Sequence, residues 1–413
     1  MKVLWFSNTP SGYYSTDSGK GYNGGGWISS LEALVREDVE LGIVFLTASP
    51  EDAPRRVAGV DYFPVFDPSD NRKGRIKKLL LGHGGADKYL VAKYLDVVRE
   101  FKPDVIQVFG SEHSFGLVAR HTDIPVVLHV QGIVKPYYDV YLSFCSWLRY
   151  ILSAGGGFGG ALHRLYIRSR WRHAVRRESV ILHAVRNYLC RTDWDRAEIL
   201  KVNPDARIFW GGEVLRPVFY ESGPWRPSGG KPVFVTTISE PPYKGMDVVL
   251  RAGKLLMDSG LDFDWRVFGN VNPAFFEKIT GITCAQAGIS LCGVADAARL
   301  ATELVSCAAY VHPSYIDNSP NSVCEAQLLG VPVIAAAVGG VPSLVDDGRT
   351  GRLFPAGDAP ALAALLAQLP TSSPHAERSR SISAARADAL LRHDRSRIKK
   401  ELLAVYTTLC RPE

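Results

Sequence analysis

The sequence contains few cysteines, and none of them stands in a C-x-x-C pair. The seven cysteines are odd in number and scattered along the 413 residues, at Cys145, Cys190, Cys284, Cys292, Cys307, Cys324 and Cys410. This distribution argues against a disulfide framework and against a structural zinc site. It favours a reducing compartment, and we therefore expect a cytoplasmic protein.

Long apolar runs and a secretion signal are also missing. The first residues, MKVLWFSNTP, contain a short apolar run that polar residues follow at once, which is typical of a first β-strand and not of a signal peptide. The most apolar stretch, residues 141–160, contains Arg149 and breaks into glycines, so it is too short for a spanning helix of about 20 apolar residues. Apolar residues make up 46% and charged residues 22% of the chain, as in ordinary globular proteins.

What the sequence does contain is a regular alternation of strand-like and helix-like segments. Several of the strand-like segments are continuous apolar runs, as expected for strands buried on both faces of a parallel sheet. The expected strands begin at Lys2, Leu41, Pro103, Ile124, Ser179, Lys231, Asp264, Ala308 and Val331, and the clearest helices begin at Trp27, Tyr89, Met246 and Asn321. Such alternation predicts an α/β protein with two Rossmann-like domains.

A Gly- and Pro-rich stretch, residues 204–231, marks the expected domain boundary. We predict an N-terminal domain of residues 1–212, a C-terminal domain of residues 213–385, and a last helix at about 386–413 that packs back on the first domain. Ligands of open α/β sheets bind beyond the carboxyl ends of the strands. We therefore expect the two domains to face each other across a cleft that forms the site.

The segment from His312 to Phe354 carries the strongest chemical pattern. A helix is expected to begin near Asn321, and free backbone N–H groups at a helix start bind anions. Glu325, one turn later, is placed to bind the two adjacent hydroxyls of a ribose, although an isolated glutamate there is more simply a favourable helix charge. Gly339 and Gly340 would let the backbone approach a phosphate closely.

This segment resembles the signature of glycosyltransferase family 4, whose members have the GT-B fold of two facing Rossmann-like domains. The matching residues are Pro313-Ser314, Glu325-Ala326, Gly330-Val331-Pro332-Val333-Ile334, Gly339-Gly340 and Asp347-Gly348-Arg349-Thr350-Gly351. The family has a second acid eight residues before Glu325, and here that position holds Asp317, which is one methylene shorter than glutamate. The resemblance implies that Glu325 binds the donor ribose and that Asp317 contacts the transferred sugar.

The resemblance extends to Lys244-Gly245, although the family's arginine five residues earlier is replaced by Ser239. Lys244 would stabilise the negative charge of the leaving diphosphate; a solvated lysine before a helix is the plainer alternative. The glycines before the first helix resemble the family's glycine pair, and their spacing is not the G-x-G-x-x-G of a dinucleotide site. The implied donor-binding residues are Gly24, Gly25, Gly26, Ser239, Lys244, Gly245, Asn321, Ser322, Val323, Glu325, Gly339 and Gly340.

The acceptor side resembles that of bacterial polysaccharide members of the family, through Gly110-Ser111-Glu112 and through the segment Arg191–Arg196. Both Glu112 and Gln131 follow expected strands, so their side chains should face the cleft. We expect Glu112 to be an acceptor-side polar residue or base, and we expect His113 and Gln131 beside it. The catalytic candidates are Glu112, Lys244 and Asp317.

The resemblance implies a retaining, hexosyltransferase-type enzyme of cell-surface polysaccharide biosynthesis. It would move a sugar from an NDP-sugar to a hydroxyl of a saccharide or lipid-linked acceptor. We expect no metal and no permanently bound cofactor, since the D-x-D pairs at Asp193 and Asp262 are common by chance. Two alternatives remain: a catalytically inactive nucleotide-sugar-binding partner in an assembly complex, and another GT-B enzyme such as a nucleotide-sugar epimerase.

The net charge of +6 is concentrated in two basic stretches, residues 71–82 and 163–178. A solvated helix face is the default interpretation of each. The sharper hypothesis is peripheral contact with anionic lipid headgroups at the inner face of the cell membrane. No recognised nucleic-acid-binding motif accompanies the charge, so we expect no nucleic-acid partner.

Overall fold

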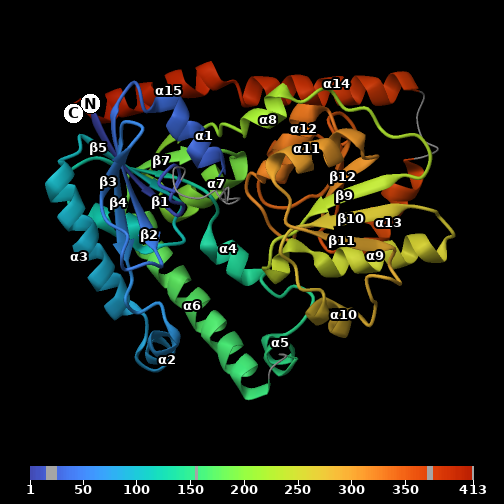
Figure 1. The fold of residues 1–413 in the computed structure, drawn as a ribbon, viewed down its shortest axis with the longest axis horizontal. Coiled ribbons are helices and arrows are strands. Elements are labelled where there is room, and N and C mark those ends of the chain that lie inside the picture. The colour runs from blue at the N-terminus through green and yellow to red at the C-terminus, as the bar shows by residue number, and fades with distance from the viewer. Residues whose placement is uncertain (15–25, 154–156, 370–374, 412–413) are drawn as a thin grey trace. The chain divides into compact units, whose positions relative to one another are not determined.

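The computed structural model describes residues 1–14, 26–153, 157–369 and 375–411, which fall into two compact units (Figure 1). Unit 1 comprises Met1–Tyr138, Leu162–Val214 and Asp394–Glu413, and unit 2 comprises Asp139–Ala161 and Leu215–His393. Each unit is built on one sheet with helices packed against it.

Unit 1 contains an eight-stranded sheet in the order β3-β4-β2-β1-β5-β6-β7-β8. Neighbouring strands are parallel except for β3 and β4, which are antiparallel. The strands are β1 Lys2–Ser7, β2 Glu40–Thr47, β3 Arg55–Val57, β4 Val60–Phe66, β5 Val105–Phe109, β6 Val126–His129, β7 Asn187–Cys190 and β8 Arg207–Trp210. Alternate residues of β1 enter two separate cores, which explains why its apolar run is continuous.

Helices cover both faces of this sheet. Helices α1 and α15 contribute to one core, and α3, the 3₁₀ segment η1, α6 and α7 contribute to the other. The helices of this unit are α1 Gly26–Val35, α2 Arg72–Leu81, α3 Gly84–Phe101, η1 Ser114–Arg120, α4 Val134–Asp139, α6 Gly157–Ala184, α7 Asp193–Val202 and α15 Arg395–Leu409. Trp5 Nε1 donates a hydrogen bond of 2.9 Å to the hydroxyl of Tyr406, so the last helix is bonded to the first strand.

Unit 2 contains a six-stranded sheet in the order β11-β10-β9-β12-β13-β14, with parallel pairing between neighbours. The strands are β9 Val233–Thr237, β10 Asp264–Phe268, β11 Ile289–Gly293, β12 Ala309–His312, β13 Val333–Ala336 and β14 Arg352–Phe354. The other elements are α5 Trp147–Leu152, α8 Pro217–Glu221, η2 Pro242–Lys244, α9 Met246–Asp258, α10 Ala274–Thr280, α11 Ala297–Ser306, α12 Asn321–Leu329, η3 Val341–Ser343, α13 Ala359–Gln368 and α14 His375–Arg392.

Two parallel-sheet α/β domains confirm the expected fold class, and the cleft between them stays a prediction. Two local predictions were wrong. The expected strand at Ser179 is the end of α6, because Ile181 and Leu182 are buried on a helix and a short apolar run does not distinguish the two structures. Strand β8 lies inside the stretch that we expected to be a linker.

The end of the chain also differs from the expected single helix. It forms two helices, α14 in unit 2 and α15 in unit 1, with a break at His393 and Asp394. The side chain of Asp394 accepts a hydrogen bond of 2.6 Å from the backbone N–H of Arg397, which caps the start of α15. The units divide between Val214 and Leu215, and residues 139–161 group with unit 2 and not with the N-terminal domain.

Among the described residues, no helix is long and apolar enough to cross a bilayer.

Candidate functional site

Lys244 and Asp317 form an ion pair at the carboxyl edge of the unit 2 sheet. Lys244 ends the 3₁₀ segment after β9, and Asp317 lies in the loop after β12. Their Nζ and Oδ2 atoms are 2.7 Å apart, and the side chains are 22% and 11% exposed. His312 Nε2 lies 3.3 Å from the same carboxylate oxygen, and the backbone N–H of Asn318 donates to the other. The carboxylate is therefore surrounded by three positive or donating groups.

This environment keeps the pair charged. Burial by itself would raise the pKa of the Asp317 carboxyl, but Lys244 and His312 outweigh it and hold that pKa well below its usual range. Burial would lower the pKa of the Lys244 ammonium, but the adjacent carboxylate reverses the shift and raises it. Both groups are ionised at neutral pH.

Two of the predicted phosphate-binding glycines pack directly on the loop that carries Asp317. Gly339 has a φ of +51°, and a Cβ atom there would lie 2.0 Å from the carbonyl oxygen of Asp317. The N–H of Gly340 donates a 3.0 Å hydrogen bond to that oxygen. Gly245 has a φ of +84°, and its Cβ would lie 2.2 Å from the carbonyl of Pro313. These glycines have a packing reason that is independent of any phosphate.

Glu325 is buried and bound by an arginine that the sequence interpretation missed. Arg216 Nε and Nη2 donate to its two carboxylate oxygens, each at 2.8 Å. Glu325 is 3% exposed, whereas the Arg216 side chain is 25% exposed. A ribose hydroxyl at Glu325 would share oxygens that already accept from this guanidinium. The only indication in the sequence was a basic residue in the Gly- and Pro-rich stretch, 109 residues earlier.

The other predicted donor residues lie at the start of α12, after β9, at the start of α1 or outside the described residues. Asn321 and Ser322 are half-buried in the first turn of α12, where Val323 is buried. Ser239 is exposed after β9. Gly26 opens α1 in unit 1, and Gly24 and Gly25 lie outside the described residues.

At the carboxyl edge of the unit 1 sheet, Glu112 and Gln131 lie against the same glycine. Gly110 has a φ of +79°, and a Cβ there would lie 1.9 Å from Glu112 Oε2 and 3.1 Å from Gln131 Cγ. Both Glu112 Oε2 and Gln131 Nε2 are buried and have no hydrogen-bond partner among the described residues. Burial raises the pKa of the Glu112 carboxyl to about 7, and the nearby Glu178 acts in the same direction. One acceptor and one donor therefore remain unused at this edge.

Two arginines fix the backbone of these two residues. Arg177 Nη2 donates to the carbonyl oxygen of Glu112, and Arg191 Nη2 donates to that of Gln131 at 2.6 Å. Each arginine is itself paired with an acid, Asp87 at 3.0 Å and Glu213 at 2.6 Å. In the sequence, Arg191 was only part of a segment that resembles the family, and nothing there indicated that Arg177 and Arg191 bind backbone carbonyls.

The two histidines near this edge differ. His113 is exposed, next to the ring of Phe115 at 5.6 Å between centroids. His129 is 1% exposed and packs against Trp27 and Phe109, with ring centroids 5.1 and 5.6 Å away. His129 is therefore a core residue, and the structure does not bring His113 into contact with Gln131 in any described interaction.

Asp193 and Asp195, the first D-x-D pair, belong to the start of α7. Asp195 accepts from the backbone N–H groups of Arg191 and Thr192, and the Thr192 side chain accepts from Asp195 N, which forms a capping box. In the part of the chain that the structure describes, no group of three His, Cys, Asp or Glu residues is placed to hold a metal. The expectation of a metal-free reaction stays a prediction.

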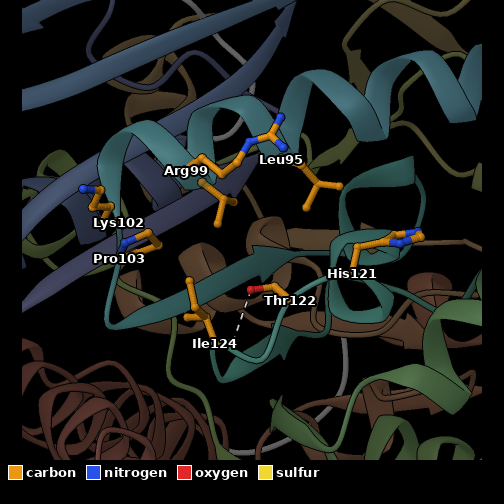
Figure 2. A pocket seen from close by; sticks show the side chains of 8 residues that line it. Leu95, Arg99, Lys102, Pro103, His121, Thr122 and Ile124 are labelled. Atoms are coloured by element: carbon orange, nitrogen blue, oxygen red, sulfur yellow. Dashed lines mark hydrogen bonds between the residues drawn. The ribbon is translucent and has the colours of Figure 1, made fainter.

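An open pocket of unit 1 lies at the opposite edge of its sheet. It has a volume of about 450 Å³ and is lined at the amino ends of β5 and β6, where Figure 2 shows Arg99, Lys102 and His121 around it. Ligands of parallel sheets bind at the carboxyl ends of the strands. This pocket contains none of the predicted site residues.

Part of the chain is similar in sequence to known proteins. Residues 230–371 match the sequence model of the family described as "Glycosyl transferases group 1". The chain is 34% identical over 148 residues to the D-inositol 3-phosphate glycosyltransferase of Streptomyces coelicolor. This alignment covers 33% of this chain and 31% of that relative. The match thus spans about a third of the length of the curated relative.

Solved structures are similar over nearly the whole chain. The sucrose-phosphate synthase of Thermosynechococcus elongatus has a TM-score of 0.73 at 17% identity, and the superposition covers 99% of this chain and 98% of the synthase chain. HepE of Anabaena, solved in complex with UDP and glucose, has a TM-score of 0.64 at 14% identity, covering 99% and 100%. At such identities the similarity shows a shared fold.

Proposed function

We propose that this chain, whose residues 230–371 belong to the glycosyl transferases group 1 family, is a retaining glycosyltransferase. It moves a sugar from an NDP-sugar to a hydroxyl of a saccharide or lipid-linked acceptor, in cell-surface polysaccharide biosynthesis. The observation that carries the proposal is the convergence of Lys244, Asp317, Gly339 and Gly340 at the carboxyl edge of one parallel sheet.

In this proposal the donor diphosphate binds beside Lys244. The ammonium and the backbone N–H groups of Asn321 and Ser322 at the start of α12 stabilise the negative charge that grows on the diphosphate as the sugar leaves. Asp317 keeps Lys244 ionised and in position, since their atoms are 2.7 Å apart. These groups supply the positive charge of the site, so no metal or permanently bound cofactor is required.

The acceptor hydroxyl binds between Glu112 and Gln131. Gln131 Nε2 donates to the hydroxyl oxygen, and the hydroxyl donates to Glu112 Oε2, which satisfies both unused atoms. The bond from the sugar anomeric carbon to the diphosphate breaks and its electron pair leaves with the NDP. A new bond forms to the acceptor oxygen through an oxocarbenium-like transition state, and the acceptor proton passes to the Glu112 carboxylate.

Names of similar proteins support the substrate class. HepE was solved with UDP and glucose, and the Streptomyces relative is named for a phosphorylated inositol acceptor. A nucleotide-sugar donor and a polyol-like hydroxyl acceptor agree with the charged edge of unit 2 and the uncharged polar atoms of unit 1. The scattered cysteines support a cytoplasmic location at the inner face of the cell membrane, where a lipid-linked acceptor would be available.

The test is a thermal-shift screen of the chain with UDP, GDP, ADP and their sugars. A ligand at about 100 times its Kd stabilises the folded state by roughly 2.7 kcal/mol. We expect one nucleotide family to raise Tm and Lys244→Met to weaken the shift. If no nucleotide or nucleotide sugar raises Tm at millimolar concentration, the donor site does not exist and the proposal fails.

The second candidate function is a nucleotide-sugar-binding partner without catalysis. Ser239, exposed in place of the family's arginine, favours it, because one diphosphate cation is missing. Release of free nucleotide in the presence of donor and acceptor separates the two functions. Binding without nucleotide release over a broad acceptor panel supports the inactive partner, and conversion of the donor to its epimer supports the epimerase alternative.

A further inference from the structure

Helix α2 is a basic surface helix that buries none of its residues. Its sequence, RKGRIKKLLL, contains five basic residues and no acidic residue. Ile76, Leu80 and Leu81 are 43%, 76% and 78% exposed. A helix that has no buried side chain gains little from its own protein, and exposed apolar groups gathered on one element mark an interaction site.

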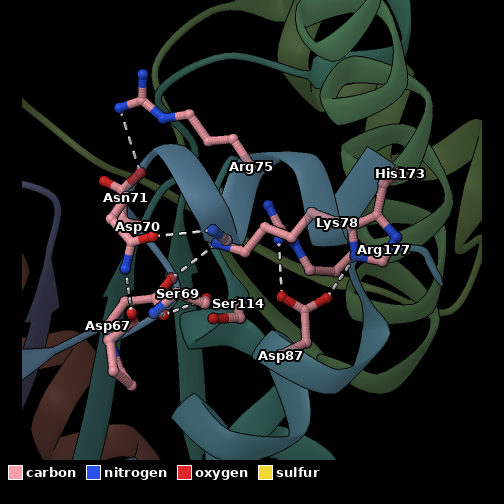
Figure 3. A network of polar contacts seen from close by, with 12 residues as sticks. Asp67, Ser69, Asp70, Asn71, Arg75, Lys78, Asp87, Ser114, His173 and Arg177 are labelled. Atoms are coloured by element: carbon pink, nitrogen blue, oxygen red, sulfur yellow. Dashed lines mark hydrogen bonds and ion pairs between the residues drawn. The ribbon is translucent and has the colours of Figure 1, made fainter. Parts of the chain in front are cut away.

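The residues of α2 are sorted onto two sides. Gly74 and Lys78, four apart and therefore on one face, point inward. A Cβ on Gly74 would lie 2.0 Å from the carbonyl oxygen of Ser69, and Lys78 Nζ pairs with Asp67 Oδ2 at 3.1 Å, with both side chains at most 15% exposed. Figure 3 shows Lys78 and Asp67 within this network. The inner side is thus fixed by polar contacts.

The outer side carries two parallel rows of four-residue spacing. One row is Arg72, Ile76 and Leu80, and the other is Lys73, Lys77 and Leu81. The first row contains one exposed basic residue and the second contains two, and each row ends in an exposed leucine. This face presents cations beside apolar side chains over two adjacent helix ridges.

The second basic stretch, on α6, is used differently. His173 Nε2 lies 2.6 Å and Arg177 Nη1 3.0 Å from the two carboxylate oxygens of Asp87 on α3, as Figure 3 shows. Arg177 also donates to the carbonyl of Glu112. The inward basic residues of α6 therefore stabilise unit 1, whereas Arg172 and Arg176 remain exposed.

We propose that the outer face of α2 docks this protein on an anionic lipid bilayer. Interfacial helices bind a bilayer by placing basic side chains at the level of the lipid phosphates and inserting apolar side chains, such as leucines, beneath them. A nucleic acid would satisfy the cations but would leave Ile76, Leu80 and Leu81 in water. The docking deepens the proposed function, because it brings the chain to the surface that holds a lipid-linked acceptor, but it does not require the transfer reaction.

The experiment is flotation of the full chain, without donor, on vesicles of phosphatidylcholine alone or with about 30% phosphatidylglycerol. At about 50 mM NaCl we expect binding to the anionic vesicles only, and release at about 500 mM, where charges are strongly screened. Each basic side chain near such a surface contributes about fivefold in affinity, so Lys73→Glu/Lys77→Glu should lose at least about 25-fold.

Matched variants separate α2 from the rest of the surface. Arg172→Glu/Arg176→Glu makes the same charge change at the same spacing on α6, and we expect a loss of at most about fivefold through the net charge alone. Leu80→Ser/Leu81→Ser should lower the affinity for anionic vesicles at least about fivefold, because the leucines no longer bury apolar surface in the bilayer. Leu390→Ser/Leu391→Ser, which alters two exposed leucines of α14, should lose none.

Three results would overturn the proposal. The first is that the chain floats equally, or not at all, with both vesicle compositions. The second is that the α6 variant loses as much vesicle affinity as the α2 lysine variant. The third is tight binding to single-stranded RNA but not to vesicles, abolished by the same lysine changes. The nucleotide thermal shift, measured on each variant, should stay unchanged. It reports separately on the donor site, so failure of docking and failure of the proposed function are distinguishable.

Discussion

The carboxyl edges of the two sheets have the same place in two similar domains, yet their polar groups are arranged in opposite ways. In unit 2, Lys244 and Asp317 pair at 2.7 Å, and Glu325 accepts from Arg216 through both oxygens. In unit 1, Glu112 Oε2 and Gln131 Nε2 are buried, and no residue in the described part of the chain hydrogen-bonds them. The predicted acids of the unit 2 edge are thus both in ion pairs, whereas Glu112 and Gln131 of unit 1 keep one side-chain atom each that no described residue hydrogen-bonds.

The difference corresponds to two kinds of ligand. A diphosphate brings its own strong negative charge, so its site needs a cation that stays ionised when the site is empty, and a nearby carboxylate ensures this. A hydroxyl is neutral and both donates and accepts, so its site needs one unused acceptor and one unused donor. The following predictions test this contrast, from the largest expected effect to the smallest.

Lys244→Met removes the cation from the charged edge. We expect kcat/KM for transfer to fall about 10²–10³-fold, as on removal of a group that stabilises a developing anion. The measurement is nucleotide release under subsaturating donor. Lys254→Met, which removes an exposed lysine paired with Asp258 on the same unit, is the control. A loss of less than about threefold would mean that Lys244 is only the partner of Asp317.

Glu325→Ala breaks the pair with Arg216. Since the removed carboxylate is 3% exposed, we expect the free energy of unfolding to fall by about 3 kcal/mol in urea titrations. The double variant Arg216→Met/Glu325→Met leaves no stranded charge and should recover most of that loss. It should still lack the nucleotide thermal shift. A double variant that binds nucleotide normally would show that Glu325 has a structural role alone.

Glu112→Gln tests the unused carboxyl through pH. Because burial raises its pKa to about 7, the folded state retains a proton that the unfolded state releases near the ordinary value of 4.5. The free energy of unfolding of the wild type should therefore fall as pH rises through this interval, and Glu112→Gln should abolish that fall. Transfer by the wild type should rise with pH through about 7, and the variant should lose roughly 10²-fold at pH 8, the lower end of what a positioned general base contributes.

A pH profile of stability that is identical in wild type and Glu112→Gln would show that this carboxyl titrates normally. In that case the contrast between the two edges would be lost on the unit 1 side.

Gln131→Ala removes the unused donor and has the smallest expected effect. A neutral hydrogen bond contributes about 1 kcal/mol, so we expect KM for the acceptor to rise about fivefold while the nucleotide thermal shift stays constant. Stability should change little, because Nε2 makes no hydrogen bond to any residue that the structure describes. A large loss of stability would indicate a packing role against Gly110 and would remove the argument for a hydroxyl site.

Much of the fold could be predicted because local sequence patterns indicate the strands and helices. Continuous apolar runs predicted β1, β2, β5, β6, β9, β12 and β13, most of whose residues are buried, and β10 was predicted although Arg266 interrupts its apolar run. The strands that were not expected, β3, β4, β7, β8, β11 and β14, are mostly short or at sheet edges, where the apolar run is too brief to separate strand from helix or loop. The same ambiguity made the end of α6 look like a strand.

The amino-acid sequence by itself determined which chemical groups stand at the ends of the strands: a lysine after β9, acids after β12 and within α12, and Glu112 and Gln131 after β5 and β6. Only the tertiary structure decided their partners. Arg216 meets Glu325 across 109 residues, and Lys244 meets Asp317 across 73. Hydrogen bonds and ion pairs form over about 3 Å, a distance that no local pattern encodes.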